Sequence, residues 1–150
     1  MGEKPSVKIR LPREISEITL RIGLREKPNL VEVLSNKQLA ALGDSYLNFL
    51  YSVYLSGKLG HPTGSRIKGS ILQNALKDSG LRKILPKRVD RHSQADAFEA
   101  LAAYSLIKEL VSFKKALKIL NKHEDSVAGM TELALHMKKE FENDKSKSTS

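Results

Sequence analysis

The chain has 150 residues, 40% of them hydrophobic and 29% charged, so it is long enough for one domain with a buried core and too short for two large domains. It contains no cysteine, which excludes disulfides, thiolate metal sites and cysteine nucleophiles. The formal net charge of +9 indicates a polyanionic partner, and the lack of an apolar run that could cross a bilayer or serve as a signal peptide predicts a cytoplasmic protein with no membrane partner.

The first 29 residues predict an N-terminal arm and a first helix. Apolar residues alternate with basic ones at 7–11, as in a short strand, and isoleucines at helical spacing predict a helix over 14–25. One or two further helical turns are expected at 29–34.

A long helix is predicted from Ser35 to about Ser56, with Ser35 at its N-cap and Gln38 completing a capping box. Apolar side chains cover most of its circumference. We therefore expect this helix to be the central element of the domain.

One narrow polar strip interrupts that apolar surface. It consists of Asp44, Asn48 and Ser52, at intervals of four residues. A carboxylate in such a place needs a hydrogen-bond network, an arginine partner, a proton or a cation. The strip alone does not decide between a structural and a functional role.

The segment 57–92 is strongly basic, with an excess of seven positive charges. A glycine-rich loop at 57–64 leads to a basic helix over 65–79 and a basic connector over 80–92. The loop lacks the spacing and the lysine of a nucleotide-binding P-loop, so no nucleotide cofactor is expected. A solubilising surface would explain scattered charge, whereas clustering favours phosphate contacts. The candidates for RNA phosphate contacts are Arg66, Lys68, Lys87, Arg88, Arg91 and His92.

Ser93 is predicted to cap a second long helix, which several alanines keep slim. A continuation over 114–122 and a last helix around 127–141 complete an all-α plan. The predicted divisions are an arm and first helix at 1–29, a core at 30–112, a C-terminal helical extension at 113–142 and a disordered tail at 143–150.

Asp96 and Glu99 project from one face of this second long helix. A first-turn position, favoured by the helix dipole, would explain Asp96 but not Glu99. If the two long helices pack side by side, these acids converge with Asp44, and their mutual repulsion requires a divalent cation. Oxygen ligands beside a basic surface predict the Mg²⁺ site of a phosphodiesterase, with Mn²⁺ as a possible substitute.

Two segments resemble, in order, the signature helices of the ribonuclease III catalytic domain. They are SNKQLAALGDSYLNFLYSVYL at 35–55 and QADAFEALAAYSLI at 94–107, and the second contains an unbroken seven-residue agreement at 95–101. The resemblance covers about residues 30–112. It implies an all-α endonuclease domain that forms a symmetric homodimer, binds double-stranded RNA and hydrolyses it with Mg²⁺.

Carried over residue by residue, the resemblance implies catalytic and metal-binding roles for Asp44, Asp96 and Glu99. The family carries glutamates at the positions of Lys37, Ala40 and Asn48 in this chain. The chain is closest in style to mini-ribonuclease III, a short form that has no separate double-stranded-RNA-binding domain, lacks the glutamate before its Gly-Asp pair and is an enzyme.

Three functions remain open at the level of sequence. The first is an RNA-processing endoribonuclease, a Mg²⁺-dependent hydrolase of phosphodiester bonds in double-stranded or structured RNA. The second is a catalytically impaired ribonuclease III-like domain that binds double-stranded RNA or a ribonucleoprotein without cleaving it. The third, a helical protein-interaction module with a basic surface, requires the resemblance to be accidental.

Overall fold

The computed structural model describes residue 24 and residues 27–149, and within these residues it is all-helical, as predicted. The strand-like arm lies outside the described residues, and so does the helix predicted over 14–25 apart from residue 24. No helix in the described part is long and apolar enough to traverse a membrane. The helices are α3 (Leu30–Leu34), α4 (Lys37–Leu59), α5 (Gly69–Asp78), the short 3₁₀ helix η1 (Leu81–Ile84), α6 (Arg91–Ile107), α7 (Phe113–Asn121) and α8 (Ser126–Thr149).

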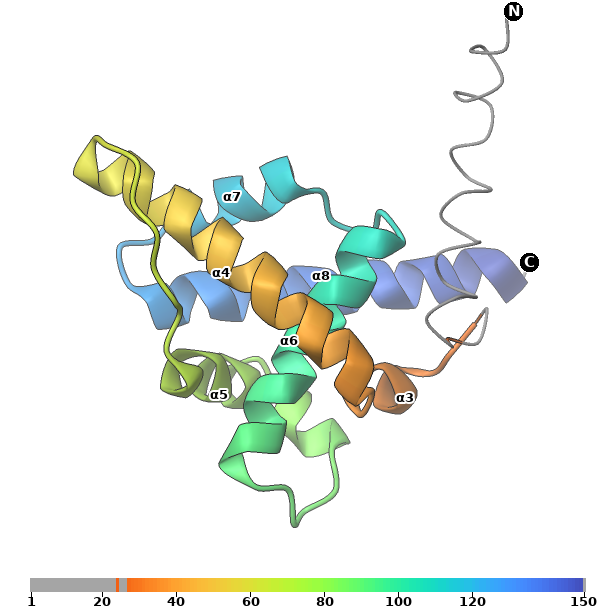
Figure 1. Cartoon of the computed structure of the whole chain (residues 1–150). Helices are drawn as coiled ribbons and strands as arrows, with labels where there is room; N and C mark the ends of the chain where they lie inside the picture. The colour runs from red at the N-terminus through yellow and green to blue at the C-terminus, as the bar shows by residue number, and fades with distance from the viewer. Residues whose placement is uncertain (1–23, 25–26, 150) are drawn as a thin grey trace, which may run out of the picture.

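Helix α6, rather than α4, is the central element of the fold. Every residue from 97 to 105 is buried, and α6 packs against α3, α4, α5 and α8. Figure 1 shows α4 crossing α6. Small side chains on several faces of α6 let its neighbours approach from several directions. Helix α4 instead leaves one apolar stripe uncovered, on which Phe49 is 62% exposed and Leu42 is also exposed.

The start of α4 differs by one residue from the prediction. Asn36, not Ser35, is the N-cap, since the Asn36 side chain accepts a hydrogen bond from the backbone N–H of Leu39 at 2.9 Å. Ser35 instead ends α3. Serine and asparagine are both favoured N-cap residues. Ser35 is already the C-cap of α3, so Asn36 caps α4.

The start of α6 also differs from the prediction. Asp90 is the N-cap, and its carboxylate accepts a hydrogen bond from the backbone N–H of Ser93 at 2.7 Å. This hydrogen bond lowers the pKa of Asp90. The helix therefore begins at Arg91, and Asp96 lies beyond the first turn, where the helix dipole no longer explains its presence.

Helices α7 and α8 contribute to the same core as α4 and α6. Both bury apolar side chains, and α8 packs against α5, α6 and α7. Helix α8 continues to Thr149, so it includes most of the tail that we expected to lack regular structure. The buried residues of these two helices are Ala116, Ile119, Leu120, Met130, Leu133, Ala134, Met137 and Phe141.

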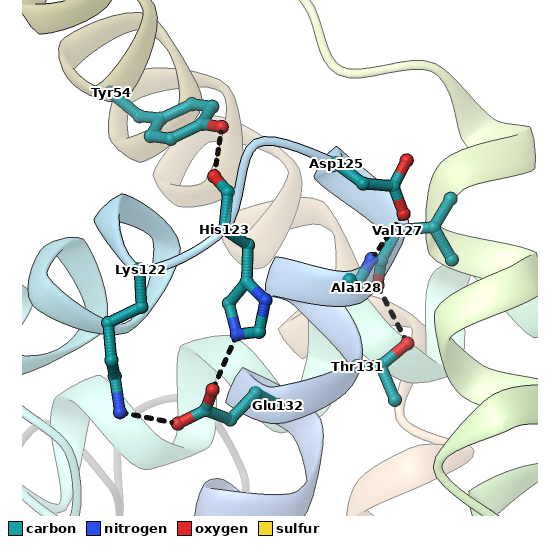
Figure 2. A network of polar contacts seen from close by, with 8 residues as sticks. All are labelled: Tyr54, Lys122, His123, Asp125, Val127, Ala128, Thr131 and Glu132. Atoms are coloured by element: carbon teal, nitrogen blue, oxygen red, sulfur yellow. Dashed lines mark hydrogen bonds and ion pairs between the residues drawn. The ribbon is translucent and has the colours of Figure 1, made fainter.

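A polar network joins the turn between α7 and α8 to α4 (Figure 2). The Lys122 ammonium and the His123 ring bind the two carboxylate oxygens of Glu132, at 2.8 and 2.5 Å. The Tyr54 hydroxyl donates a hydrogen bond to the His123 carbonyl at 2.9 Å. Because the contact with Lys122 favours the ionised carboxylate, the pKa of Glu132 is lowered.

Candidate active site

Helices α4 and α6 come into backbone contact at Gly43. A Cβ atom on this residue would lie only 1.8 Å from the carbonyl oxygen of Glu99, so no other residue type fits without moving a helix. The contact brings Asp44, the next residue of α4, beside α6. Gly43 thus allows the two helices to come close together, and this close approach places Asp44 at the pocket between them.

The three predicted acids, Asp44, Asp96 and Glu99, line one pocket of about 440 Å³. The pocket lies where α4, α6 and the start of α5 meet, so both signature helices contribute to it. Three side chains that can carry positive charge also line it, namely Lys37, Arg66 and His92.

Glu99 is the most buried of the three acids and is only 8% exposed. Burial raises its pKa to about 8, and a hydrogen bond to Asp44 and the negative charges of Asp44 and Asp96 act in the same direction. The nearby Arg66 opposes this rise. At neutral pH, Glu99 therefore retains a proton that it shares with Asp44.

Asp96 is paired with a lysine rather than with the other two acids. The Lys37 ammonium lies 2.9 Å from the Asp96 carboxylate and 2.9 Å from the Ser93 hydroxyl. His92 lies one helical turn before Asp96, with its Nε2 atom 3.7 Å from the same carboxylate oxygen. The Asp96 carboxylate thus has a cationic partner within the chain.

Asp44 has a more distant cationic partner. The Arg66 guanidinium lies 3.4 Å from both of its carboxylate oxygens, and the Asn48 side-chain amide donates to one of them at 3.3 Å. Both of the structural explanations considered for Asp44, an arginine partner and a hydrogen-bond network, are therefore present. Both contacts lie at the long end of the hydrogen-bond range.

The polar strip of α4 holds the segment 60–68 against the helix. The Ser52 hydroxyl accepts a hydrogen bond from the backbone N–H of Ser65 at 2.8 Å and donates to the Ser65 carbonyl at 2.9 Å. The Asn48 side chain accepts from the backbone N–H of Ile67 at 2.9 Å. Figure 1 shows this segment returning along α4 towards α5.

The same strip has two consequences. It extends one turn beyond the predicted residues to Ser56, which binds the backbone of Thr63. It also holds the backbone at Ser65 and Ile67 against α4, and the chain stays extended as far as Lys68, so the basic helix begins at Gly69 and not at Ser65. The strip thereby places Arg66 at the pocket.

The predicted RNA-binding residues are all exposed, but they do not form one cluster. Arg66 and His92 line the pocket with the acids, and Arg88 lines a neighbouring pocket of about 240 Å³ that also includes Lys37. The remaining three line neither of these pockets; they are Lys68, Lys87 and Arg91.

In this arrangement, two of the three acids, Asp44 and Glu99, are placed to hold a divalent cation together. Within the described residues, no group of three or more histidine and acidic side chains is close enough together to hold a metal ion. Asp44 and Glu99 are in hydrogen-bond contact, and burial is the main cause of the raised pKa of Glu99. Their oxygen atoms fit a hard cation such as Mg²⁺, whereas Asp96 is turned to Lys37.

The sequence indicated Lys37 as a departure from the family pattern that could neutralise the acids, but it did not predict the pairing with Asp96 in particular. The available signal was its position as the first residue of a helix, where acidic rather than basic residues are favoured. Arg82 was also counted only as surface charge. Its guanidinium donates to the carbonyls of Pro86 and Lys87 and so braces the basic connector.

Comparison with known proteins identifies the family. A family model described as Ribonuclease III matches residues 37–143, which is more than half of the chain. The chain therefore belongs to the ribonuclease III family. The match extends beyond Ser112, so α7 and most of α8 lie within the matched region and are not outside it. No curated protein matches the chain.

Proposed function

We propose that the protein is a Mg²⁺-dependent endoribonuclease that hydrolyses phosphodiester bonds in double-stranded or structured RNA. One observation carries this proposal: acids from both signature helices line one pocket, and a buried glutamate with a raised pKa hydrogen-bonds to a second acid there. A divalent cation between these acids would offset the burial and mutual repulsion that disfavour their charged forms. We propose that the protein acts in the cytoplasm.

The residues of the pocket divide the work between them. Asp44 and Glu99 would hold the cation through carboxylate oxygens, and Asp96, positioned by Lys37, would complete the acidic lining of the catalytic pocket. A bound Mg²⁺ supplies Lewis acidity for the phosphodiester and activates water for its hydrolysis. The Arg66 guanidinium, held at the pocket mouth, would bind a backbone phosphate when it leaves Asp44.

The exposed basic residues support binding of an A-form duplex, which proteins recognise through phosphates, 2′-hydroxyls and shape. Arg66 and His92 would contact phosphates beside the scissile bond. Lys87 and Arg88, in the connector before α6, and Arg91, the first residue of α6, would contact phosphates farther along the duplex. Lys68, the N-cap residue of α5, is a further exposed candidate for a phosphate contact.

We also propose that the protein acts as a homodimer. The uncovered stripe on α4, which includes Leu42 and Phe49, faces away from the polar strip that holds Asp44. Phe49 stacks at 5.5 Å on Phe113, so the apolar surface continues onto α7. A second copy that packs on this surface would remove it from water and leave both pockets open.

A second function has one observation in its favour. Lys37 and Arg66 already neutralise Asp96 and Asp44, and Ala40 replaces a glutamate of the family signature. A ribonuclease III-like domain that binds double-stranded RNA or a ribonucleoprotein without cleaving it would have these features. The decisive difference is whether RNA is cut.

The test is incubation of the purified protein with a long RNA duplex and Mg²⁺. We expect fragments from the wild type, none from Asp44→Asn, and wild-type cutting by Asp78→Asn, which changes an exposed acid at the end of α5. Binding of the duplex by wild type without any cutting would establish the second function instead. Duplex affinity that barely changes between low and high salt would contradict the basic phosphate-binding surface.

A further inference from the structure

Lys37 occupies a place that the local helix does not explain. It is the first residue of α4, where the helix dipole disfavours positive charge, and Asn36 already caps the helix end. Its ammonium reaches across to α6, 59 residues away in sequence, to contact Asp96. The side chain therefore serves the contact between the two helices that carry the acids.

Lys37 satisfies Asp96 more fully than Arg66 satisfies Asp44. The Lys37–Asp96 distance is 2.9 Å and the Asp96 side chain is 15% exposed, whereas the Arg66–Asp44 distance is 3.4 Å and the Asp44 side chain is 40% exposed. The Lys37 side chain is itself 60% exposed, but a short ion pair with a largely covered carboxylate is harder to displace than a long one with a hydrated carboxylate. An entering cation would therefore compete with Arg66 for Asp44 far more easily than with Lys37 for Asp96.

The second contact of Lys37 fixes the first. One ammonium hydrogen goes to the Ser93 hydroxyl, also at 2.9 Å, and Ser93 lies one turn before Asp96 on α6. An ammonium donates up to three hydrogen bonds and can hold both oxygens at once. Lys37 is thus anchored at two points on α6 and is not a freely moving surface lysine.

We propose that the Lys37 ammonium is a built-in cation of the site, which reserves Asp96 so that the pocket takes a single divalent cation at Asp44 and Glu99. This inference rests on the proposed metal-dependent function. A divalent ion held by all three acids would stand beside the ammonium and be repelled by it. Lys37 is therefore a positioning residue that limits how many cations the site accepts and which acids bind them.

The test measures Mn²⁺ binding to the full chain without RNA, by electron paramagnetic resonance and calorimetry. The wild type is expected to bind one Mn²⁺ in the pocket. Asp44→Asn should weaken that binding by about tenfold or more, and Asp96→Asn should change it little. In Lys37→Met, Asp96 should be free to bind Mn²⁺, so that the variant binds Mn²⁺ more tightly or binds a second ion. This gain should be absent from the Lys37→Met, Asp96→Asn double variant.

Two controls separate this role from general effects of charge or folding. Lys37→Arg keeps a cation and should retain wild-type stoichiometry, and Lys118→Met removes an exposed lysine on α7 and should behave as wild type. Circular dichroism confirms that each variant is folded. Equal loss of Mn²⁺ binding in Asp44→Asn and Asp96→Asn, unchanged binding in Lys37→Met, or no binding to the wild type would each overturn the proposal.

The outcome is separable from that of the cleavage test. A protein that binds one Mn²⁺ as described but leaves duplex RNA intact would refute the nuclease function and retain the role of Lys37. A protein that cuts RNA but binds Mn²⁺ equally through all three acids would retain the function and refute the role of Lys37.

Discussion

In the part of the chain that the structure describes, Glu99 is the only buried residue with an ionisable acidic or basic side chain other than tyrosine. Its native pKa of about 8 lies well above the ordinary value of 4.5, mainly because burial disfavours the carboxylate. Between these two pH values the unfolded chain releases the proton while the folded chain keeps it. Folding therefore becomes less favourable as pH rises through this window, and the loss is complete above about pH 8.

Glu99→Gln should remove this pH dependence. Each unit of pKa difference corresponds to about 1.4 kcal/mol, so the wild type should lose a few kcal/mol of stability between pH 5 and pH 8.5, while the variant lacks this loss. The measurement is the thermal midpoint across that range, in a chelator. Glu142→Gln, at an exposed position on α8, should follow the wild type. Parallel curves for wild type and Glu99→Gln would contradict the buried carboxyl.

At the scale of elements, the contact between α4 and α6 depends on the absence of a side chain at Gly43. Gly57 lies in the same helix but has open space around the position of a Cβ atom. The two glycines therefore form a matched pair. One is required by a neighbouring backbone, and the other only lowers helix propensity.

Gly43→Ala should destabilise the fold by about 3 kcal/mol or more, because the methyl group forces the helices apart. Gly57→Ala should instead stabilise it by about 0.5–1 kcal/mol. Denaturant unfolding of both variants measures the difference. A mild effect at Gly43, similar to that at Gly57, would mean that the two backbones are not in contact.

The polar strip of α4 supports a prediction about the segment 60–68. Ser52→Ala removes both hydrogen bonds to Ser65 and should cost about 1–3 kcal/mol, with faster amide exchange at Ser65. Ser45→Ala, on the exposed face of the same helix, should leave that exchange unchanged. Unaltered protection of the Ser65 amide in Ser52→Ala would show that other contacts hold the segment.

Sequence periodicity was sufficient to predict the all-α plan and the two helices that carry the acids. The sequence also predicted that Asp44, Asp96 and Glu99 converge if the two helices pack side by side, and all three line one pocket, although Asp96 is paired with Lys37. It failed for contacts that depend on tertiary approach. Lys37 meets Asp96 across 59 residues, and no local pattern specifies that pairing.

Helix boundaries were the other weak point, for a related reason. Ser35 and Asn36 are both suitable N-caps, and the end of α3 decides between them. The prediction that α4 is the central helix was wrong. An apolar surface all around a helix indicates that the helix is buried, but the covering surface can belong to the same chain or to another one. The uncovered stripe around Phe49 is compatible with burial in a dimer.

At the scale of the whole molecule, the dimer proposal predicts the effect of a charge on that stripe. Phe49→Asp should give a folded monomer. The side chain at position 49 is mostly exposed within one copy, so the fold tolerates aspartate there, whereas dimerisation would remove the charged carboxylate from water. Sedimentation velocity measures the change. Leu135→Asp, at an exposed apolar residue on α8, should remain a dimer. A wild-type chain that sediments as a monomer would contradict the proposal.

The direct contact of the two main chains at Gly43 makes this pocket suitable for redesign. Because the spacing of Asp44 and Glu99 is set by the main chain, a library that varies rim positions such as Ala41 and His92 would exchange the surroundings while the acids keep their places. The fold would then act as a fixed frame on which recognition of other phosphate-containing ligands could be selected.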